Sequence, residues 1–219
     1  MILVPIKDFA DAKQRLAPVL TPEQRSELAR VMFTDVLRAL AGLREAPAVA
    51  IVTRNAEATR LAAEFGFARI YDGLNAGETE AIACGTEQAA ARGAEFTLVI
   101  PADVPLVTPQ EIQRVLDSAP SQGTVLAAAA DNQGTNAILR RPAALFPAQF
   151  GNHSFVPHLR AAIATRKPTV VLKLEGLALD IDRPADLKSL ARASGNTASQ
   201  QLVRSWEFGH VAVARAAGF

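Results

Sequence analysis

The chain has 219 residues, of which 49% are hydrophobic and 21% are charged, and this is the composition of an ordinary globular protein with a full core. The formal net charge is +1, which excludes a general binder of nucleic acid or other polyanions. The single cysteine, Cys84, excludes an internal disulfide, and neither a membrane-spanning run nor a signal peptide is recognisable, so we expect a cytoplasmic protein.

The first half of the chain alternates between short apolar runs and amphipathic segments. Strands are predicted at residues 2–6, 49–53, 68–71 and 96–100, and helices from residue 22, over 57–65 and 76–92, and from residue 109. The helices that follow Thr21 and Thr108 begin with a threonine cap, a proline and then Gln24 or Glu111, which is a capping box. Alternating strands and helices predict a mainly parallel sheet wrapped by helices.

The second half is mixed α/β. Strands are predicted at residues 125–130, 137–140, 169–174 and 178–181, and helices at 156–165 and 184–193. We therefore expect one three-layer α/β/α domain with a Rossmann-like sheet over residues 1–193. Residues 194–219 are expected to be a small polar linker and a tail that contains the only tryptophan, Trp206.

The most informative stretch reads Phe-Thr-Leu-Val-Ile-Pro-Ala-Asp-Val-Pro-Leu, residues 96–106. Its apolar run ends at Pro101, so Asp103 is expected at the carboxyl end of a buried strand. Ligands bind at that edge of open α/β sheets, and a carboxylate held there by stiff backbone suits a divalent metal that contacts phosphates. The alternative is an ordinary strand-to-helix turn in which Asp103 is a local cap.

A basic loop follows the first strand and leaves the sheet at the same edge. It carries Lys7, Lys13 and Arg15, and three cations there suit a triphosphate, with lysine as a point charge and arginine as a fork for two oxygens. The loop has no glycine, so it is neither a Walker loop nor a dinucleotide fingerprint. The alternative is a solvated loop whose cations pair with Asp8 and Asp11.

A further polar turn follows the third strand. Gly73 permits backbone to approach a flat ligand, and Asn75 suits the edge of a base. A plain turn explains the same residues.

Two segments later in the chain suit a small anion. Thr135 and Asn136 lie in a polar loop, and Gly151 and Ser154 precede a predicted helix, so hydroxyls, a glycine and helix amides occur together. The alternative for the second segment is a helix cap by Asn152 or Ser154. His153 is expected at the surface.

Asp180 and Asp182 end the predicted strand 178–181. Alternation along a strand places both on one face, where one of them can complete a metal site with Asp103. The alternative for Asp182 is to cap the helix that begins near Pro184.

Taken together, these segments resemble the guanylyltransferases of coenzyme F-420 biosynthesis. The likeness covers residues 4–190 and rests on seven segments in the same order: Val4-Pro5-Ile6-Lys7, Ala12-Lys13-Gln14-Arg15-Leu16-Ala17, Gly73-Leu74-Asn75, Pro101-Ala102-Asp103-Val104-Pro105-Leu106, Gly134-Thr135-Asn136-Ala137, Phe150-Gly151 with Ser154-Phe155, and Leu179-Asp180-Ile181-Asp182-Arg183-Pro184-Ala185-Asp186-Leu187. The related molybdenum cofactor guanylyltransferases carry a glycine-rich first loop that is missing here. The resemblance implies a nucleotidyltransferase with the fold of nucleotide-diphospho-sugar transferases.

The resemblance also implies roles for the residues above. Magnesium is held by Asp103 with Asp180 and Asp182, and Lys13, Arg15 and Asp103 are the catalytic residues. The triphosphate of GTP meets Lys7, Lys13 and Arg15, its nucleoside lies near Gly73 and Asn75, and the phosphorylated acid is held by Thr135, Asn136, Gly151 and Ser154. Two features depart from the family pattern, namely the acidic run Gly77-Glu78-Thr79-Glu80 and the tail after Ser194.

Several alternatives stay open on the sequence alone. The acceptor is 2-phospho-L-lactate, phosphoenolpyruvate or 3-phospho-D-glycerate, and the Ala- and Arg-rich composition favours the last two by favouring a bacterial source. The rival functions are another nucleotidyltransferase, such as a molybdopterin or sugar-phosphate enzyme, and a non-catalytic nucleotide-binding regulator. No nucleic-acid or membrane partner is expected, and a homodimer is slightly favoured over a monomer.

Overall fold

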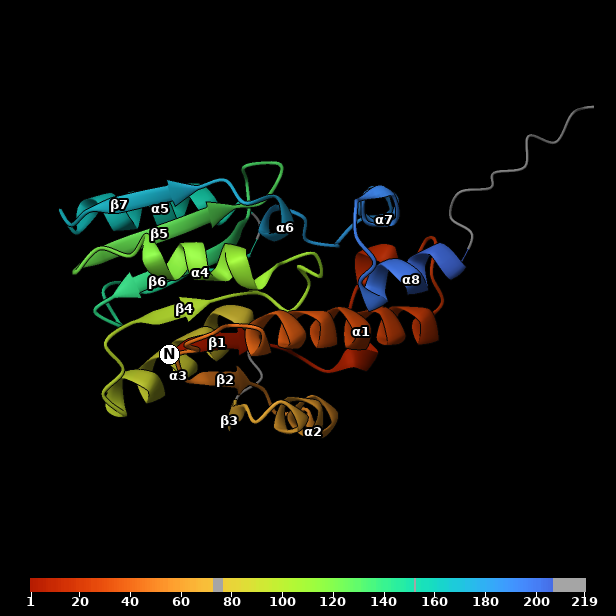
Figure 1. Ribbon diagram of the computed structural model, residues 1–219, viewed down its shortest axis with the longest axis horizontal. Coiled ribbons are helices and arrows are strands. Elements are labelled where there is room, and N and C mark those ends of the chain that lie inside the picture. The colour runs from red at the N-terminus through yellow and green to blue at the C-terminus, as the bar shows by residue number, and fades with distance from the viewer. Residues whose placement is uncertain (73–76, 152, 207–219) are drawn as a thin grey trace, which may run out of the picture.

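The computed structural model describes residues 1–72, 77–151 and 153–206. The strands of this part of the chain are β1 (Ile2–Pro5), β2 (Val49–Val52), β3 (Ala68–Ile70), β4 (Thr97–Val99), β5 (Gly123–Ala128), β6 (Thr135–Arg141) and β7 (Thr169–Leu172). They form one sheet in the order β3-β2-β1-β4-β6-β5-β7 (Figure 1). Only the two pairings made by β6 are antiparallel, which confirms the predicted mainly parallel sheet.

Helices pack on both faces of this sheet. The helices of the described residues are α1 (Pro22–Ala41), α2 (Ala56–Glu64), α3 (Glu78–Ala91), α4 (Pro109–Asp117), α5 (Phe155–Ala164), α6 (Glu175–Ala178), α7 (Pro184–Arg192) and α8 (Ala198–Ser205). The capping boxes predicted at Thr21 and Thr108 are both formed. Such caps satisfy backbone groups within a few residues of each other, so the sequence alone specifies them.

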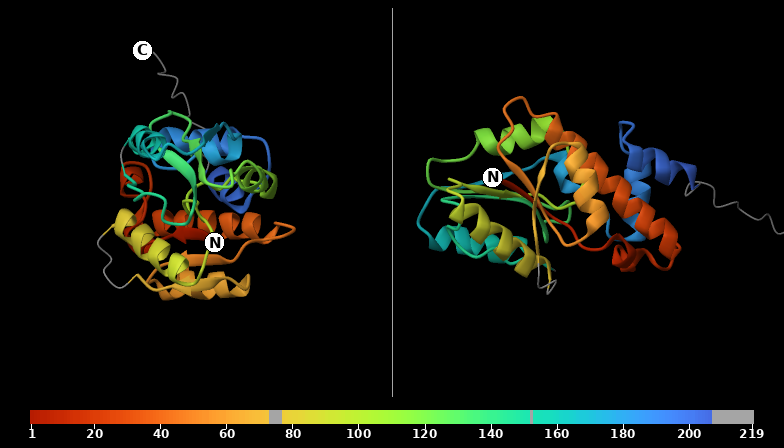
Figure 2. Two further views of the ribbon diagram at one scale, coloured as in Figure 1. Left: turned by 90° about the vertical axis from the view of Figure 1, so that its left-hand side faces the viewer. Right: turned by 90° about the horizontal axis from the view of Figure 1, so that it is seen from below.

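Alternation along the strands divides the core into two layers. Ile2 and Val4 of β1 pack with α1, α2, α4 and α6 on one face, whereas Leu3 packs with α3 and α5 on the other. The right-hand view of Figure 2 shows α4 in green and α3 in yellow on opposite sides of the sheet. The predicted three-layer α/β/α architecture is therefore confirmed.

The predicted strand at residues 178–181 is wrong. Residues 175–178 form the short helix α6 instead, and the chain after it is extended but pairs with no strand of the described part of the chain. The amide of Gly176 donates to Glu111 Oε1 at 2.7 Å, and the Asn136 side chain donates to the carbonyls of Leu177 and Ala178 at 2.8 and 3.3 Å. Side chains from α4 and β6 thus hold α6 in place, and within the predicted strand the Ala178 carbonyl and the Ile181 amide bind Ala130 N and the Asp103 carbonyl instead of a neighbouring strand.

The carboxyl-terminal helices build a third, smaller apolar cluster. It joins α1 and the loop before it to the chain around α7 and α8, through Leu16, Leu20, Leu28, Met32, Ile181, Leu187, Leu190 and Val203. The predicted linker over residues 194–199 extends two residues into α8, which packs on α1 and α7. The domain boundary at residue 193 stays a prediction.

A buried carboxylate on α1 anchors α8. Asp35 accepts hydrogen bonds from Ser199 N at 2.8 Å, Ser199 Oγ at 2.6 Å and Ala198 N at 3.2 Å, at the helix end where a negative charge is favoured.

We expect Asp35→Ala to lower the free energy of unfolding by about 2–3 kcal/mol, because it removes charge-assisted hydrogen bonds from a buried site. Urea unfolding would measure the loss. Glu27→Ala, an exposed change on the same helix, is the matched control. Equal midpoints for Asp35→Ala and the wild type would contradict the anchoring role.

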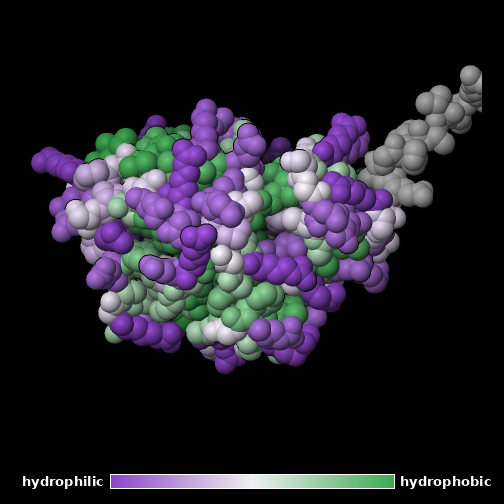
Figure 3. Space-filling model, viewed as in Figure 1, coloured by the Kyte–Doolittle hydropathy of each residue, from purple (hydrophilic) through white to green (hydrophobic). Residues whose placement is uncertain are grey.

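The outer surface is mostly polar. Figure 3 shows polar residues over much of one face, with apolar residues gathered near β7, the edge strand of the sheet. Val171 of β7 is 48% exposed, and Val156 and Ile163 of α5 are also exposed. Among the described residues, no helix is long and apolar enough to cross a membrane.

Candidate active site

The candidate site lies along one edge of the sheet. The parallel strands end there, and β6, being antiparallel, begins there, so Thr135 and Asn136 lie at the same edge as the chain after β1 and β4. The chain runs from β1 to β2 and β3 on one side and then returns to place β4 on the other side of β1. Ligands bind at such a switch point in open α/β sheets.

Lys13 joins two of the predicted metal ligands. Its Nζ donates to Asp103 Oδ2 at 2.6 Å and to Asp182 Oδ1 at 2.9 Å, and Arg15 Nη1 donates to Asp182 Oδ2 at 3.0 Å. Asp103 does not cap a helix, because Thr108 caps α4. The structure therefore brings Lys13, Arg15, Asp103 and Asp182 together.

Lys13 does not lie in a solvated loop that pairs with Asp8. Lys13 lies in the left-handed region at φ 54°, which is rare for a side chain of this size and is typical of functional sites. Asp8, one of the two loop partners considered from sequence, instead accepts from Asn55 Nδ2 at 2.8 Å and lies 3.8 Å from Arg54 Nη2. The Lys13 side chain is only 10% exposed and is committed to the site.

Hydrogen bonds to the chain after β4 and to the Asp186 side chain of α7 hold the segment that carries Asp182. Ile181 N donates to the Asp103 carbonyl at 3.1 Å, which fixes the two acidic residues relative to each other. Asp186 Oδ2 accepts from Asp182 N at 3.0 Å and from Arg183 N at 2.6 Å. Asp186 and Arg183 thus form the cap of α7, so the Asp182 carboxylate is not a helix cap.

Asp180 is oriented by Asn136 of β6. Asn136 Nδ2 donates to Asp180 Oδ1 at 3.0 Å as well as to the two carbonyls of α6 described above. The amide nitrogen of Asn136, which is 4% exposed, is therefore fully used within the protein. Its evident contribution is to hold Asp180 at the site.

The charges of this cluster are strongly coupled. Burial alone would lower the pKa of Lys13, but the carboxylates of Asp103 and Asp182 outweigh it and raise that pKa above its ordinary value. Burial would raise the pKa of Asp182, but Lys13 and Arg15 lower it. Burial and the charges of Asp103 and Asp182 raise the pKa of Asp180. The ammonium of Lys13 thus lies between the carboxylates of Asp103 and Asp182.

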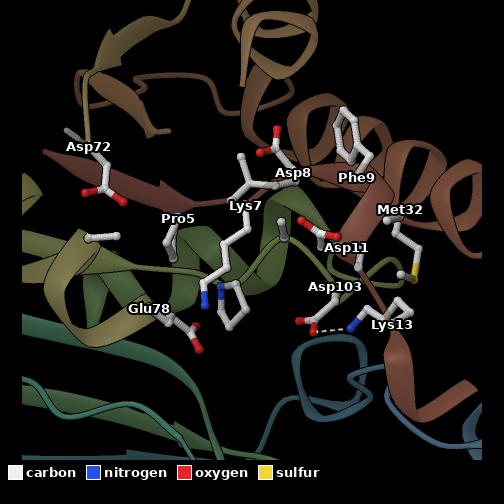
Figure 4. A pocket seen from close by; sticks show the side chains of 16 residues that line it. Pro5, Lys7, Asp8, Phe9, Asp11, Lys13, Met32, Asp72, Glu78 and Asp103 are labelled. Atoms are coloured by element: carbon white, nitrogen blue, oxygen red, sulfur yellow. Dashed lines mark hydrogen bonds and ion pairs between the residues drawn. The ribbon is translucent and has the colours of Figure 1, made fainter. Parts of the chain in front are cut away.

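Glu78 lines the cavity that contains Lys13, Asp103 and Asp182. It begins α3 and, with Lys7 of the basic loop, extends into the space beside the Lys13–Asp103 pair (Figure 4). Burial raises the pKa of Glu78 to about 7, and the charge of Asp103 adds to this effect. The acidic run that departs from the family pattern therefore places a carboxyl group in the cavity.

We expect Glu78→Gln to stabilise the metal-free protein more at pH 8 than at pH 5. The folded pKa of about 7 lies above the ordinary 4.5, so the folded wild type binds this proton more tightly and loses stability as the pH rises through that interval. Thermal unfolding with a chelator would measure the difference, and Glu80→Gln, at an exposed position on the same turn, is the control. A gain in stability that is the same at pH 5 and pH 8 would contradict the raised pKa of Glu78.

Hydroxyl groups form the opposite wall. Ser154 Oγ accepts from Thr135 N at 3.1 Å, so Ser154 occupies the N-cap position of α5 without a side-chain capping bond. Thr135, Gly151 and Ser154 line one cavity with Lys13, Arg15 and the three aspartates, and its volume is about 500 Å³. That volume lies in the usual range for small-molecule sites. The structure thus brings the predicted anion-binding segments opposite the cationic loop.

The turn predicted to lie near the nucleoside is not among the described residues. Gly73, Leu74 and Asn75 lie outside the described residues, whereas the preceding Asp72 is buried and lines a neighbouring cavity that also includes Lys7 and Glu78. His153 is exposed, as expected from the sequence.

Comparison with known proteins decides the family. The model of the family described as "Guanylyl transferase CofC like" matches residues 1–217. The chain belongs to this family. The resemblance drawn from seven short segments is therefore confirmed.

Relatives of this CofC-like chain carry the names of guanylyltransferases for three different phosphorylated acids. It is 38% identical over 191 residues to a phosphoenolpyruvate guanylyltransferase of Sphaerobacter thermophilus, covering 86% of this chain and 91% of the relative. It is 33% identical over 193 residues to a 3-phospho-D-glycerate guanylyltransferase of Phenylobacterium zucineum, covering 87% and 88%. It is 28% identical over 211 residues to a 2-phospho-L-lactate guanylyltransferase of Methanothermobacter thermautotrophicus, covering 94% and 90%.

The fold of this family member is also found in solved structures. A Desulfovibrio desulfuricans protein assigned to the nucleotide-diphospho-sugar transferases aligns with a TM-score of 0.74 over 93% of each chain, at 20% identity. At that identity the likeness concerns the fold alone, and it agrees with the fold expected from the sequence.

Two residues of the guanylyl transferase site were missed by sequence reasoning. Glu78 was noted only as a departure from the family pattern, and His158 was not considered. His158 follows Ser154 by four residues on a helix, so both lie on one face. That spacing was the available signal, and the partner on β6 was not visible in the sequence.

The acidic residues fit magnesium in their chemistry. Asp103, Asp180 and Asp182 offer carboxylate oxygens, which are the ligands that magnesium prefers, and two of them already share the ammonium of Lys13. Within residues 1–72, 77–151 and 153–206 no three acidic, histidine or cysteine side chains lie close enough to form a complete metal cluster. A metal between Asp103 and Asp182 therefore requires Lys13 to move away.

Proposed function

We propose that the protein transfers GMP from GTP to a small phosphorylated carboxylic acid, with release of pyrophosphate, as a step in coenzyme F-420 biosynthesis in the cytoplasm. The observation that carries this proposal is a single cavity with cations and carboxylates on one wall and the Thr135–Ser154 hydroxyls on the other. Membership of the guanylyl transferase family supports the reaction type.

The acceptor attacks through a phosphate oxygen. A phosphate monoester has its second pKa near about 6, so this oxygen is already ionised at neutral pH and needs no general base. The α-phosphorus of GTP is the electrophile, and pyrophosphate leaves in line. The main obstacle is repulsion between two anions, which positive charge at the site must relieve.

The basic loop supplies part of that charge. Lys7, Lys13 and Arg15 would contact the triphosphate, and Lys13 would exchange one or both carboxylate partners for phosphate oxygens. Gly73 and Asn75 are proposed to lie near the nucleoside. Magnesium, held by Asp103 with Asp180 or Asp182, would neutralise charge on the phosphates and the leaving pyrophosphate.

The hydroxyl wall would hold the acceptor. Thr135, Gly151 and Ser154 are proposed to bind the phosphorylated acid, with Asn136 orienting Asp180 between the two substrates. Phosphoenolpyruvate and 3-phospho-D-glycerate are the favoured acids, because the relatives of higher identity among those described above carry these names. Whether two copies of the chain associate stays a prediction, to be tested by sedimentation.

The proposal is tested by incubating the protein with GTP, magnesium and each of the three acids in turn. Pyrophosphate release is followed, and the GDP-linked product is identified by mass. Product with one acid identifies the acceptor, and ATP and CTP in place of GTP are the nucleotide controls. GTP binding without turnover would favour a non-catalytic regulator, and turnover only with molybdopterin or a sugar phosphate would favour the other rival.

A further inference from the structure

His158 connects the two segments that form the hydroxyl wall. It lies in the second turn of α5 and is 1% exposed. One ring nitrogen, Nε2, is 2.9 Å from the backbone nitrogen of Gln149, and the other, Nδ1, is 2.9 Å from Thr135 Oγ1. The ring also packs edge-on against Phe150, which precedes Gly151.

These contacts determine which ring nitrogen carries the proton. A backbone N–H can only donate, so Nε2 must accept from Gln149 and cannot be protonated in this arrangement. Burial and the nearby charge of Arg140 lower the pKa of His158 to about 4, so the ring is neutral at physiological pH. The single ring proton therefore lies on Nδ1 and is donated to Thr135 Oγ1.

The direction of this bond constrains the Thr135 hydroxyl. Its oxygen accepts from His158, so its own hydrogen must be donated elsewhere, and no acceptor for it lies within the described part of the chain. Ser154 is in the same situation, because its oxygen accepts from Thr135 N. Both residues lie at the cavity wall, 3% and 4% exposed, and each keeps one hydroxyl hydrogen for a ligand that binds there.

We propose that His158 is a positioning residue that commits the Thr135 hydroxyl to donation and so makes this wall selective for an ionised phosphate or carboxylate. The inference rests on the proposed function, in which this wall holds the phosphorylated acid. A neutral ring suits the role, because it orients the hydroxyl without adding a charge that would bind any anion in the cavity. The same ring binds the Gln149 amide and thereby holds the backbone that leads to Gly151.

Two substitutions separate the two bonds of the ring. The amide nitrogen of asparagine occupies the position of Nδ1, so His158→Asn keeps a donor to Thr135, whereas glutamine reaches the position of Nε2, so His158→Gln keeps an acceptor for Gln149. Loss of one aligned hydrogen bond corresponds to about a tenfold change in binding. We expect His158→Gln to raise the KM for phosphoenolpyruvate about tenfold with the KM for GTP unchanged, and His158→Asn to raise it about twofold or less.

A double-mutant comparison separates positioning from packing. Thr135→Val removes the hydroxyl that His158 is proposed to orient, so adding His158→Gln to it should raise the KM for the acid no further. Equal effects of His158→Gln and His158→Asn, or the same factor in both backgrounds, would show a purely structural role and overturn the proposal.

A measurement on the wild type is independent of folding of the variants and of turnover. Nitrogen NMR of the histidine rings should show His158 as the neutral Nδ1–H tautomer, without titration between pH 5 and 8. Titration with inorganic phosphate should then shift the Thr135 and Ser154 amide signals. A neutral Nε2–H tautomer would overturn the inference. No turnover with any acid, together with the expected tautomer and phosphate response, would instead contradict the proposed reaction alone.

Discussion

Replacing Asp103 with asparagine should abolish nucleotidyl transfer while leaving the protein folded. Asp103 lies at the switch point of the sheet, and its carboxylate is bound by Lys13 Nζ at 2.6 Å. Asparagine has nearly the same shape but neither the charge that balances Lys13 nor the second anionic oxygen that magnesium requires. Loss of one such aimed electrostatic contact costs roughly 3 kcal/mol, or about a hundredfold in rate, and a lost metal site costs more.

The measurement is kcat for pyrophosphate release in saturating GTP and acid. Asp117→Asn, an exposed change on α4, is the control for the chemical substitution, and thermal unfolding of both variants reports on folding. An Asp103→Asn enzyme with wild-type kcat would exclude Asp103 as a metal ligand. A variant that is inactive because it is unfolded would leave Asp103 with a structural role, which urea unfolding distinguishes.

Replacing Lys13 with methionine should lower kcat about a hundredfold. Methionine keeps the length and much of the packing of the stem but removes the ammonium that is proposed to pass from the carboxylates to the triphosphate. The change also leaves Asp103 and Asp182 without their shared cation, so the pKa of Asp182 should rise towards its ordinary value or above.

The second effect has a defined sign. In the wild type the folded pKa of Asp182 is lowered, so its ion pairs stabilise the protein above the ordinary pKa of 3.8 and are lost as the pH falls below it. In Lys13→Met this acid-dependent loss should be smaller than in the wild type. Lys188→Met, an exposed lysine on α7, is the matched control for kcat and for the pH dependence of unfolding. Wild-type kcat in Lys13→Met would remove Lys13 from the reaction.

The features that the sequence predicts well are those fixed by neighbouring residues. The capping boxes at Thr21 and Thr108 and the end of β4 before Asp103 depend on contacts within a few positions, so the pattern alone specifies them. The convergence of Asp103 with the basic loop follows from sheet topology, because successive parallel strands end at one edge.

The features that the sequence does not predict depend on distant partners. Residues 178–181 have a strand-like pattern, but the Ala178 carbonyl accepts from Ala130 N and Asn136 Nδ2, and Ile181 N donates to the Asp103 carbonyl. Ser154 has the pattern of a helix cap, yet its hydroxyl binds the amide of Thr135, 19 positions away. Lys13 was expected to face a triphosphate, and in the structure its carboxylate partners are 90 and 169 positions distant. Such pairings compete with local preferences and are decided only when the chain is folded.

The small apolar cluster beneath the site links residues from both ends of the chain. Leu16 follows Lys13 and Arg15, Ile181 lies between Asp180 and Asp182, and Val203 of α8 packs in the same cluster. The cationic and acidic halves of the site therefore belong to one cooperative unit. Their backbone amides and those of α8 should lose protection against hydrogen–deuterium exchange together. A chain that ended at residue 193 would keep every candidate site residue and still lose the support that aligns them.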